Sequence, residues 1–591
     1  FSRLAAAARR RLVERHLAGP RAGRLLRNIA KIKTLFLAGY YGDPATHRSV
    51  GFVAVANRPR NLPPNPPLEP FGRPVLRLGP PQHGESVLAA DLCVVGSGAG
   101  GAVVAALAAE AGRRVVLLEE GRYVRSAEIT HDEPAMSAAL YKESGLQSTV
   151  DLGMTILQGQ ALGGTTTINN HICFRLLNDA DLFPGSGERV LDRWDQLGAR
   201  LDRGLLAESY DRVSGRIGVA RIPPAMVGSN GASLLDGWRT LVSQGAAPAE
   251  FPSGTFKKNF DRCGGCGYCN FGCPYERKLS MLETYVTAAA NARARLVTEC
   301  HAETVLLDGG RATGVRAKLA DGREIRVNAQ QVVVAGGAIG SSVLLLRSGV
   351  GRNIGSRFSF NAATPVFARY PASIDAFDGD QMTAYVDSGD YILESSFNPP
   401  MAFAVALPGW FETHFDRMRA FTRFASAGVV VGTAADGRIK RSALLRNLFG
   451  PVAWSMAPDD FATLRSGVAM LAAAYFSGGA ELVLPASVID VPLRRDDFVR
   501  DGKVQVDRIT AALERALRRP SDLTLNSSHP QGGNPMSDDP RRGAVTAECR
   551  VHGIDNLFVC DASVFPSTVR INPQLTVMAL ADYAWHRAIR G

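Results

Sequence analysis

The chain lacks any uninterrupted apolar run of about 18 residues, the minimum length for a membrane-spanning helix. The nearest candidate, GVAMLAAAYFSGGAELVLP, is broken by Ser477, Gly478, Gly479 and Glu481, so we expect it in a folded core. The sequence also lacks a signal-peptide pattern, an internal repeat and a long low-complexity tract. Because it begins at Phe1 and not at methionine, the native N-terminus and any targeting signal stay open.

Cysteine is scarce and odd in number, with nine residues in 591. Four of the nine lie in one short turn, and the others are scattered, several of them in apolar runs: Cys93, Cys173, Cys300, Cys549 and Cys560. This distribution is not that of a disulfide framework. It predicts a reducing compartment, and therefore a cytoplasmic protein.

The formal net charge is +11, and much of the excess lies in ARRRLVERHLAGPRAGRLLRNIAKIKTLF near the start. No aromatic residues alternate with these charges and no nucleic-acid module accompanies them, so we expect no nucleic-acid partner. Between the charges stand Leu4, Leu12, Leu17, Leu25, Leu26, Ile29 and Ile32. Residues 1–56 are thus predicted as a basic amphipathic helical arm. It would lie peripherally on the inner face of a membrane, or pack on its own protein or a second subunit.

Composition and size indicate a large α/β enzyme of more than one packed unit, with 46% hydrophobic residues and 60 glycines. Residues 57–86 are rich in proline and form a predicted linker. After it, SVLAADLCVVGSGAGGAVVAALAAEAGRRVVLLEEG reads as strand, glycine turn, helix and strand. This order is typical of a Rossmann-like dinucleotide-binding domain.

The glycine turn carries the pattern that binds a pyrophosphate. Gly96 permits the tight turn, Gly98 lets the phosphates approach the backbone, and Gly101 lets the helix pack on the strand. Glu119 ends the second strand and is the predicted ligand of the ribose hydroxyls, whereas Glu120 points to the opposite face. The pattern alone does not decide between FAD and NAD.

Three further segments resemble the glucose–methanol–choline (GMC) oxidoreductases, which oxidise alcohols with FAD. They are GQALGGTTTINNHICF (159–174), GAIGSSVLLLRSGVG (337–351), and the C-terminal stretch that runs from SSHPQGGNP through NLFVCDASVFPSTVRINPQLTV. Gln160 and Cys173 depart from the commonest residues of the first signature. The resemblance implies FAD, an FAD-binding domain in two parts (87–354 and 521–591), and a substrate-binding cap of antiparallel sheet and helices (355–520). A nicotinamide-dependent dehydrogenase is the competing interpretation, but no second GxGxxG follows a strand.

The resemblance also implies the cofactor contacts. Backbone-rich loops and strand ends supply them, since N–H groups and glycines can approach a phosphate or a flavin edge. The predicted residues beyond the glycine turn are Gly163, Gly164, Thr165, Asn169, Asn170, Gly337, Asp561, Ala562, Asn572 and Pro573. We expect His171 to be structural.

Alcohol oxidation needs a group that takes the hydroxyl proton while hydride leaves the carbon. His529 matches the family's catalytic histidine and is the predicted general base, and Asn572 is predicted to hydrogen-bond the substrate oxygen. Long-chain alcohol oxidases and cholesterol-oxidase-like members are the family members that this chain resembles most. The resemblance lies in the HPQGG motif, the N-terminal extension and the YYGDP stretch within that extension. A lipophilic primary alcohol is therefore the expected substrate and a sterol its competitor. A module that binds membranes without catalysis is the alternative from another class.

In the cap, PVFARYP, YILESSF, MAFAVAL, GVVVGTA and ELVLPASVIDVPL are predicted strands, and RMRAFTRFA and DRITAALERALRR are predicted helices. Their many apolar residues fit an apolar substrate pocket and ordinary core packing equally well.

The clustered cysteines stand in CGGCGYCNFGCP, within a predicted insertion at 255–280. Cys263, Cys266, Cys269 and Cys273 have the C-x2-C-x2-C-x3-C-P spacing of bacterial ferredoxins, which predicts a three-iron or four-iron cluster. Because the fourth cysteine of such a run serves another cluster, the fourth ligand is Cys273, a remote cysteine such as Cys300, or none. Zinc, a disulfide and free thiols stay open, and so do a quinone, a carrier protein and oxygen as electron acceptor.

Overall fold

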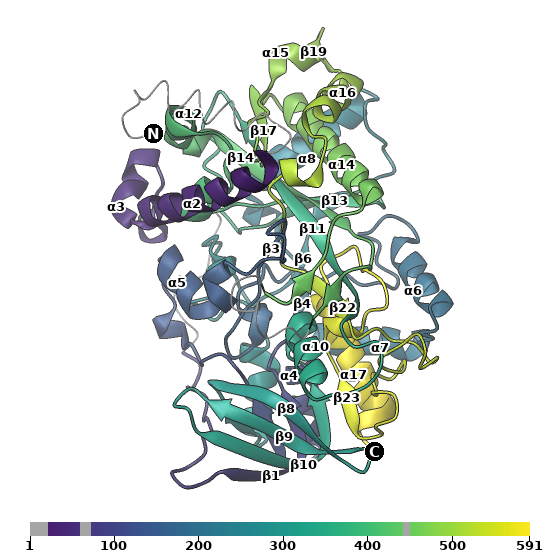
Figure 1. The fold of residues 1–591 in the computed structure, drawn as a ribbon. Coiled ribbons are helices and arrows are strands. Elements are labelled where there is room, and N and C mark those ends of the chain that lie inside the picture. The colour runs from purple at the N-terminus through teal and green to yellow at the C-terminus, as the bar shows by residue number, and fades with distance from the viewer. Residues whose placement is uncertain (1–21, 59–71, 441–449) are drawn as a thin grey trace.

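Two sheets, each covered by helices, make up the computed structural model, which describes residues 22–58, 72–440 and 450–591. In Figure 1 the Rossmann-like sheet lies at the bottom and the cap sheet with its helices at the top. The predicted α/β class, a Rossmann-like domain with an antiparallel cap, is confirmed.

The first sheet has the strand order β7-β2-β1-β10-β9-β8, and β23 pairs with β10 outside this path. Its strands are β1 Val87–Val95, β2 Val115–Leu118, β7 Arg295–Val297, β8 Cys300–Asp308, β9 Arg311–Leu319, β10 Glu324–Val334 and β23 Leu557–Val559. β7, β2, β1, β10 and β23 run parallel, whereas β9 and β8 form antiparallel pairs. The valine-rich central strands are buried on both faces, as a parallel sheet between helices requires.

The register aligns the carboxyl ends of three strands. Val334 of β10 is paired with Val95 of β1 on one side and with Val559 of β23 on the other. The turns that follow these strands therefore meet at one edge, which is where open α/β sheets bind ligands.

The cap sheet has the order β18-β17-β11-β14-β13-β12-β5, with β21 and β22 paired to β11 and β3 to β21. Its strands are β3 Thr155–Ile156, β5 Ser253–Thr255, β11 Ser356–Arg369, β12 Ala384–Asp387, β13 Tyr391–Ser395, β14 Phe424–Gly432, β17 Leu482–Pro485, β18 Leu493–Arg494, β21 Asn526–Ser527 and β22 Pro530–Gly533. Four of these strands come from outside residues 355–520. The assignment of that interval as the cap stays a prediction.

Helices cover both sheets. Those of the cap are α8 Gly228–Ser243, α11 Pro400–Ala406, α12 Phe411–Arg419, α14 Pro458–Ser477, α15 Arg495–Phe498 and α16 Val506–Ala516. The others are α2 Ala22–Gly42, α3 Pro44–His47, α4 Gly101–Glu110, α5 Glu133–Leu140, α6 Ser186–Gln196, α7 Arg203–Arg216, α9 Thr287–Asn291, α10 Gly337–Arg347 and α17 Gln574–Ala584. Small two-stranded sheets join β4 Val219–Arg221 to β6 Lys257–Asn259, β15 Arg438–Ile439 to β16 Val452–Ala453, and β19 Val499–Arg500 to β20 Lys503–Val504.

The apolar stretch interrupted at Ser477 forms the second half of α14, whose side chains are mostly buried in the cap, and then the strand β17. Within the described part of the chain, no helix combines the length and apolarity needed to cross a membrane.

The predicted strand MAFAVAL is wrong, because these residues form α11 and the start of the loop after it. Pro400 occupies the first turn, where a missing N–H costs nothing. The buried carboxylate of Glu133 accepts hydrogen bonds from the N–H groups of Met401 (2.8 Å) and Ala402 (2.9 Å). An acid held at the positive end of the helix thus stabilises the helical form. Its burial raises the pKa of Glu133 to about 8.

The predicted N-terminal arm is described only in part. Residues 22–42 form α2, which packs on α11, and Nζ of Lys33 donates to the carbonyl of Gly409 at 2.6 Å. Leu4, Leu12 and Leu17 lie outside the described residues.

A matched pair of glycine substitutions tests the packing at the sheet edge. A Cβ on Gly100 would lie 1.7 Å from the carbonyl oxygen of Cys560, whereas a Cβ on Gly98 would find its nearest atom at 3.9 Å. We expect Gly100→Ala to lower the free energy of unfolding by about 3 kcal/mol and Gly98→Ala by less than about 1 kcal/mol. Urea unfolding measures both, and equal losses would contradict the packing described here.

Candidate functional site

The glycine turn joins β1 to the N-terminus of α4. Gly96 has φ +97°, and a Cβ there would lie 2.2 Å from the carbonyl oxygen of Ala335, so only glycine fits. A Cβ on Gly101 would lie 2.0 Å from the oxygen of Gly96. Gly98 is the open member of the three, and it leaves backbone exposed beside the first N–H groups of the helix. An anion is favoured at such a place.

The loop with Gly163 and Gly164 lies against this turn. Gly163 donates its N–H to Oγ of Ser97 at 2.8 Å, and a Cβ on Gly164 would lie 2.7 Å from Cα of Gly98. Thr165 accepts the N–H of Gly159 at its hydroxyl, at 3.0 Å. The structure thus brings together two segments that the sequence separates by more than sixty residues.

Glu119 is buried at the end of β2. Its Oε2 accepts both the N–H (2.9 Å) and the hydroxyl (2.5 Å) of Ser97, and its Oε1 accepts the N–H of Gly121 at 2.8 Å. Burial raises the pKa of Glu119, against these hydrogen bonds. The carboxylate braces the glycine turn, and its contact with a ribose stays a prediction. Glu120 turns instead to Lys142, at 2.7 Å.

Asp561 follows β23 and caps the short helix Ala562–Val564. Its Oδ1 accepts the N–H of Ser563 at 2.9 Å, and its Oδ2 accepts the hydroxyl of Ser341 on α10 at 2.5 Å. Gly337, at the start of α10, has φ +78°. Pro573 precedes α17 as its N-cap. Asp561 and Gly337 therefore lie at the same sheet edge as the glycine turn.

His529 is half-buried beside β22, and a chain of amides orients it. The N–H of Val569 donates to Oε1 of Gln531 (2.8 Å), and Nε2 of Gln531 donates to Oδ1 of Asn361 (2.9 Å). Nδ2 of Asn361 then faces the carbonyl of Ile571 (2.8 Å) and Nδ1 of His529 (3.4 Å). Because backbone groups fix both amides, an N–H is directed at Nδ1. Burial lowers the pKa of His529 to about 4.

Asn572 adjoins this chain, since Asn361 holds the carbonyl of the preceding residue. The side-chain amide of Asn572 hydrogen-bonds the carboxylate of Glu394 on β13. Its buried Oδ1 has no partner among the residues that the structure describes. Burial raises the pKa of Glu394 to about 7, against the Asn572 hydrogen bond and the charge of Lys258.

The sequence analysis missed Glu394, Asn361 and Gln531. One signal was available for Glu394, because an acid inside the otherwise apolar strand YILES must be buried on pairing. The two amides carry no such signal, since their role depends on distant backbone groups.

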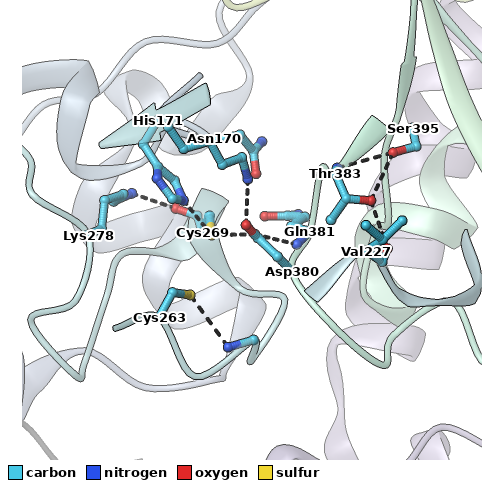
Figure 2. A network of polar contacts seen from close by, with 12 residues as sticks. Asn170, His171, Val227, Cys263, Cys269, Lys278, Asp380, Gln381, Thr383 and Ser395 are labelled. Carbon is cyan, nitrogen blue, oxygen red and sulfur yellow. Dashed lines mark hydrogen bonds and ion pairs between the residues drawn. The ribbon is translucent and has the colours of Figure 1, made fainter. Parts of the chain in front are cut away.

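Asn169 and Asn170 point in different directions. Nδ2 of Asn169 donates to Oε1 of Gln574 on α17 (2.7 Å), whereas Nδ2 of Asn170 donates to Oδ1 of Asn270 in the cysteine run (2.6 Å). Figure 2 shows Asn170 beside this run. Contact of either amide with a flavin ring stays a prediction.

All four clustered cysteines line one small cavity, together with His171, Tyr275, Arg277 and Lys278. All nine cysteines are free thiols. The N–H of Gly265 faces Sγ of Cys263 (3.4 Å), and the N–H of Arg277 faces Sγ of Cys273 (3.3 Å). Burial raises the pKa of the Cys266 thiol to about 12 and those of Cys263 and Cys269 well above their ordinary value.

Lys278 links the cavity to the glycine loop. The side chain is buried, and Nζ donates to the carbonyls of Thr167 (2.6 Å), Cys269 (2.8 Å) and Asn169 (3.0 Å). Close by, Nζ of Lys258 pairs with Asp380 at 2.7 Å, both fully buried. Two buried cations thus stand beside four thiols, and only Lys258 has a carboxylate partner.

Comparisons with known proteins agree with this geometry. Family models described as GMC oxidoreductase match residues 137–361 and 435–581, and an NAD(P)-binding Rossmann-like domain matches residues 94–162. An uncharacterized GMC-type oxidoreductase of Mycobacterium tuberculosis is 32% identical over 510 residues, which cover 84% of this chain and 75% of that protein. A long-chain-alcohol oxidase of Arabidopsis thaliana is 25% identical over 541 residues, 85% of this chain and 68% of that protein.

Among solved structures, pyridoxine 4-oxidase from Mesorbium loti shares the fold with a TM-score of 0.59 at 16% identity, over 84% of this chain and 99% of that one. The two GMC models follow one another in the order that the sequence signatures predict, and only residues 362–434 of the predicted cap lie between them. With the 32% identical relative, they confirm the predicted resemblance. The chain belongs to the GMC oxidoreductase family and is an oxidoreductase of CH–OH donors.

Proposed function

We propose that this protein oxidises a lipophilic primary alcohol to the aldehyde with FAD. The observation that carries the proposal is that Asn361 joins the segment of His529 to that of Asn572, whose side chain hydrogen-bonds Glu394 and has an unpartnered amide oxygen. A buried polar atom without a partner costs about 1–3 kcal/mol, which a substrate hydroxyl would recover.

The residues present fit FAD. Gly98 leaves open the backbone that a side chain would cover, and the N-terminus of α4 favours a pyrophosphate there. Glycines with positive φ at positions 163, 164 and 337 line the same edge. Bound FAD would supply the hydride acceptor, and this chain holds the alcohol and takes its proton.

Two groups can take that proton. The sequence predicts His529, which is neutral above a pKa of about 4. The N–H that Asn361 directs at Nδ1, however, favours a ring with its proton on Nε2, which donates to the substrate oxygen. Glu394, ionised above a pKa of about 7, then accepts the proton. The second assignment is the one that the amide chain supports.

Two observations support a lipophilic substrate: the similarity to long-chain-alcohol oxidases and an exposed apolar patch on the protein surface. The chain resembles long-chain-alcohol oxidases over most of its length, and a lipophilic alcohol is drawn from membranes. A sterol is the alternative, and a panel of both separates them.

The apolar patch gives the surface argument. It consists of exposed side chains on α2 and α12: Ile32, Leu35, Phe36, Tyr40, Phe411 and Phe415. Those on α2 have helical spacing along one face, Phe36 is 75% exposed, and the rings of Tyr40 and Phe415 lie 6.3 Å apart. Arg419, one turn after Phe415, is exposed as well and pairs with Asp416 at 2.7 Å. We propose that this patch rests on the inner, anionic face of a membrane.

The four-cysteine cavity is proposed to hold an iron–sulfur cluster. Burial raises the pKa of the Cys263, Cys266 and Cys269 thiols, whereas a cluster would bind cysteines as thiolates and add negative charge beside Lys278 and Lys258. Lys278 ties the cavity to the loop of Asn169, so the cluster would stand next to the flavin site. It would pass the two electrons singly to a quinone or a carrier protein, and without it oxygen is the acceptor.

Activity against pH separates the two proton acceptors. Loss of a catalytic base lowers the rate roughly a hundredfold to ten-thousandfold. We therefore expect both His529→Ala and Glu394→Gln to lower kcat/KM by a factor in this range. If Glu394 accepts the proton, kcat/KM with a fatty alcohol rises with pH through about 7, and Glu394→Gln removes the rise. A rise centred near 4 that Glu394→Gln keeps would assign the proton to His529.

The readout is anaerobic bleaching of the flavin by fatty alcohols and by sterols. His83→Ala, an exposed histidine far from the site in the sequence, serves as the control. If wild-type protein binds a flavin and no alcohol bleaches it, the proposed function is wrong.

Vesicle binding tests the apolar patch. Burying one phenylalanine is worth about 1.5–3 kcal/mol, so Phe36→Ser with Phe415→Ser should weaken binding to phosphatidylglycerol vesicles at least about tenfold. Leu307→Ser, an exposed apolar residue on β8, is the control. Unchanged vesicle binding, or a dimer that the double variant converts to a monomer, would assign the patch to another partner.

Metal analysis tests the cavity. We expect iron and acid-labile sulfide in anaerobically purified protein, and loss of most of both in Cys269→Ser, while Cys93→Ala in the core of β1 keeps them. Stoichiometric zinc without sulfide would identify a zinc site, and absence of metal would leave four structural thiols.

A further inference from the structure

Gly428 leaves a central position of the cap sheet without a side chain. It lies in the middle of β14, which pairs there with β11 on one side and β13 on the other in unbroken register. A glycine inside a strand lowers stability and marks a bulge, a bend, or the close approach of a ligand or another backbone. The register excludes a bulge, and the φ of Gly428 is not positive. A Cβ on Gly428 would meet no atom within 4 Å. Neither backbone conformation nor packing among the described residues therefore requires a glycine here.

The space over Gly428 lies on the face of the sheet that carries the candidate site. Pro365 of β11 and Glu394 of β13 are its direct partners across the sheet, and directly opposed residues share a face. Asn361, whose amide orients the predicted catalytic histidine, stands four residues from Pro365 on the same strand and so shares that face. Val429 points the other way, into the core that α14 covers, so the other face is closed.

Burial along the two strands shows that this space is open. Ala363 and Pro365 on β11 and Gly428 on β14 are half-buried, whereas the residues that flank each of them in its strand are buried. Gly432, on the same face of β14, differs, because a Cβ there would lie 3.3 Å from Cγ2 of Thr568. One glycine of the strand thus fits under a neighbouring segment, and the other lies under open space.

Glu394 is a second sign that a ligand belongs in this space. The residue is 4% exposed, and its hydrogen-bond partner in the described part of the chain is the amide of Asn572. A carboxylate has about four acceptor sites, and burying it with few donors is costly. A substrate hydroxyl between Glu394 and Asn572 would supply a further donor. The carbon that bears this hydroxyl would then lie next to Gly428, which is paired with Glu394.

The space is one side chain wide. Neighbouring strands lie about 4.8 Å apart, so Pro365 and Glu394 stand roughly 10 Å apart with only Gly428 between them. An unbranched hydrocarbon chain fits such a slot, whereas a fused ring system is wider than one side chain. Beyond Pro365 the same face becomes apolar, since the ring of Phe367 packs against that of Phe403 at 4.8 Å.

We propose that Gly428 is a specificity-determining residue of this enzyme, and that its missing side chain leaves the slot for an unbranched chain next to the carbinol carbon. This inference rests on the proposed function and decides between its two substrate classes, because a sterol would have to displace the side chains of Pro365 or Glu394. The glycine is retained in the strand because an alanine would occupy volume that the substrate needs.

Gly428→Ala tests the assignment with little disturbance of the protein. The added Cβ meets no protein atom and alanine restricts the unfolded chain, so the urea midpoint should stay the same or rise. The 1-dodecanol concentration that gives half the maximal rate of anaerobic flavin bleaching should rise at least about tenfold, and further in Gly428→Leu. Gly215→Ala, at an equally open glycine in α7, is the matched control and should leave bleaching unchanged.

The outcomes separate this inference from the proposed function. Wild-type flavin that no alcohol bleaches would end the proposed function itself. If 1-dodecanol bleaches the wild type and both Gly428 variants at the same concentrations, only the role of Gly428 is wrong. Loss of FAD from Gly428→Ala would assign the space to the cofactor, and faster bleaching of the wild type by cholesterol than by 1-dodecanol would overturn the slot. Should Gly428→Leu misfold, Gly428→Ala alone decides.

Discussion

The close approach of the glycine turn to two strand ends is the constraint on which the rest of the structure depends. Gly96 lies against the carbonyl of Ala335 after β10, and Gly100 against that of Cys560 after β23, at separations that no side chain would allow. Gly164 closes the same edge from a third segment. Because these contacts are made by backbone, they fix where α4, α10 and the short helix Ala562–Val564 begin. Every candidate cofactor contact is positioned from this edge.

The cap contributes its chemistry through β11, which carries Asn361 toward the same edge. Its amide, held by Gln531 and by the carbonyl of Ile571, connects the segment of His529 to that of Asn572. Some charged groups in this interior are paired, such as Lys258 with Asp380, and others, such as Lys278, are held by backbone carbonyls. Oδ1 of Asn572 is one of several buried polar atoms that have no partner in the described part of the chain.

Local sequence signals predicted the elements that depend on local physics. The buried valine runs gave β1 and β10, and the glycine spacing gave the turn between β1 and α4. MAFAVAL was misassigned because apolar runs of this length suit a strand and a buried helix alike. The helix is favoured because its first N–H groups donate hydrogen bonds to the carboxylate of Glu133, more than 260 residues earlier in the chain. No window of sequence around α11 contains that contact.

The sequence by itself determined the family and the Rossmann-like fold, and it predicted the chemistry-bearing residues that stand in motifs, among them His529, Asn572 and the cysteine run. These features could be predicted because a glycine spacing or a motif is recognised from positions that are neighbours in the sequence. Only the tertiary structure decided the partners: Glu394 for Asn572, Asn361 for His529, and His171 for Cys269. Burial and the direction of hydrogen bonds arise where distant segments meet, and these two properties decide which side chain holds a proton or a metal.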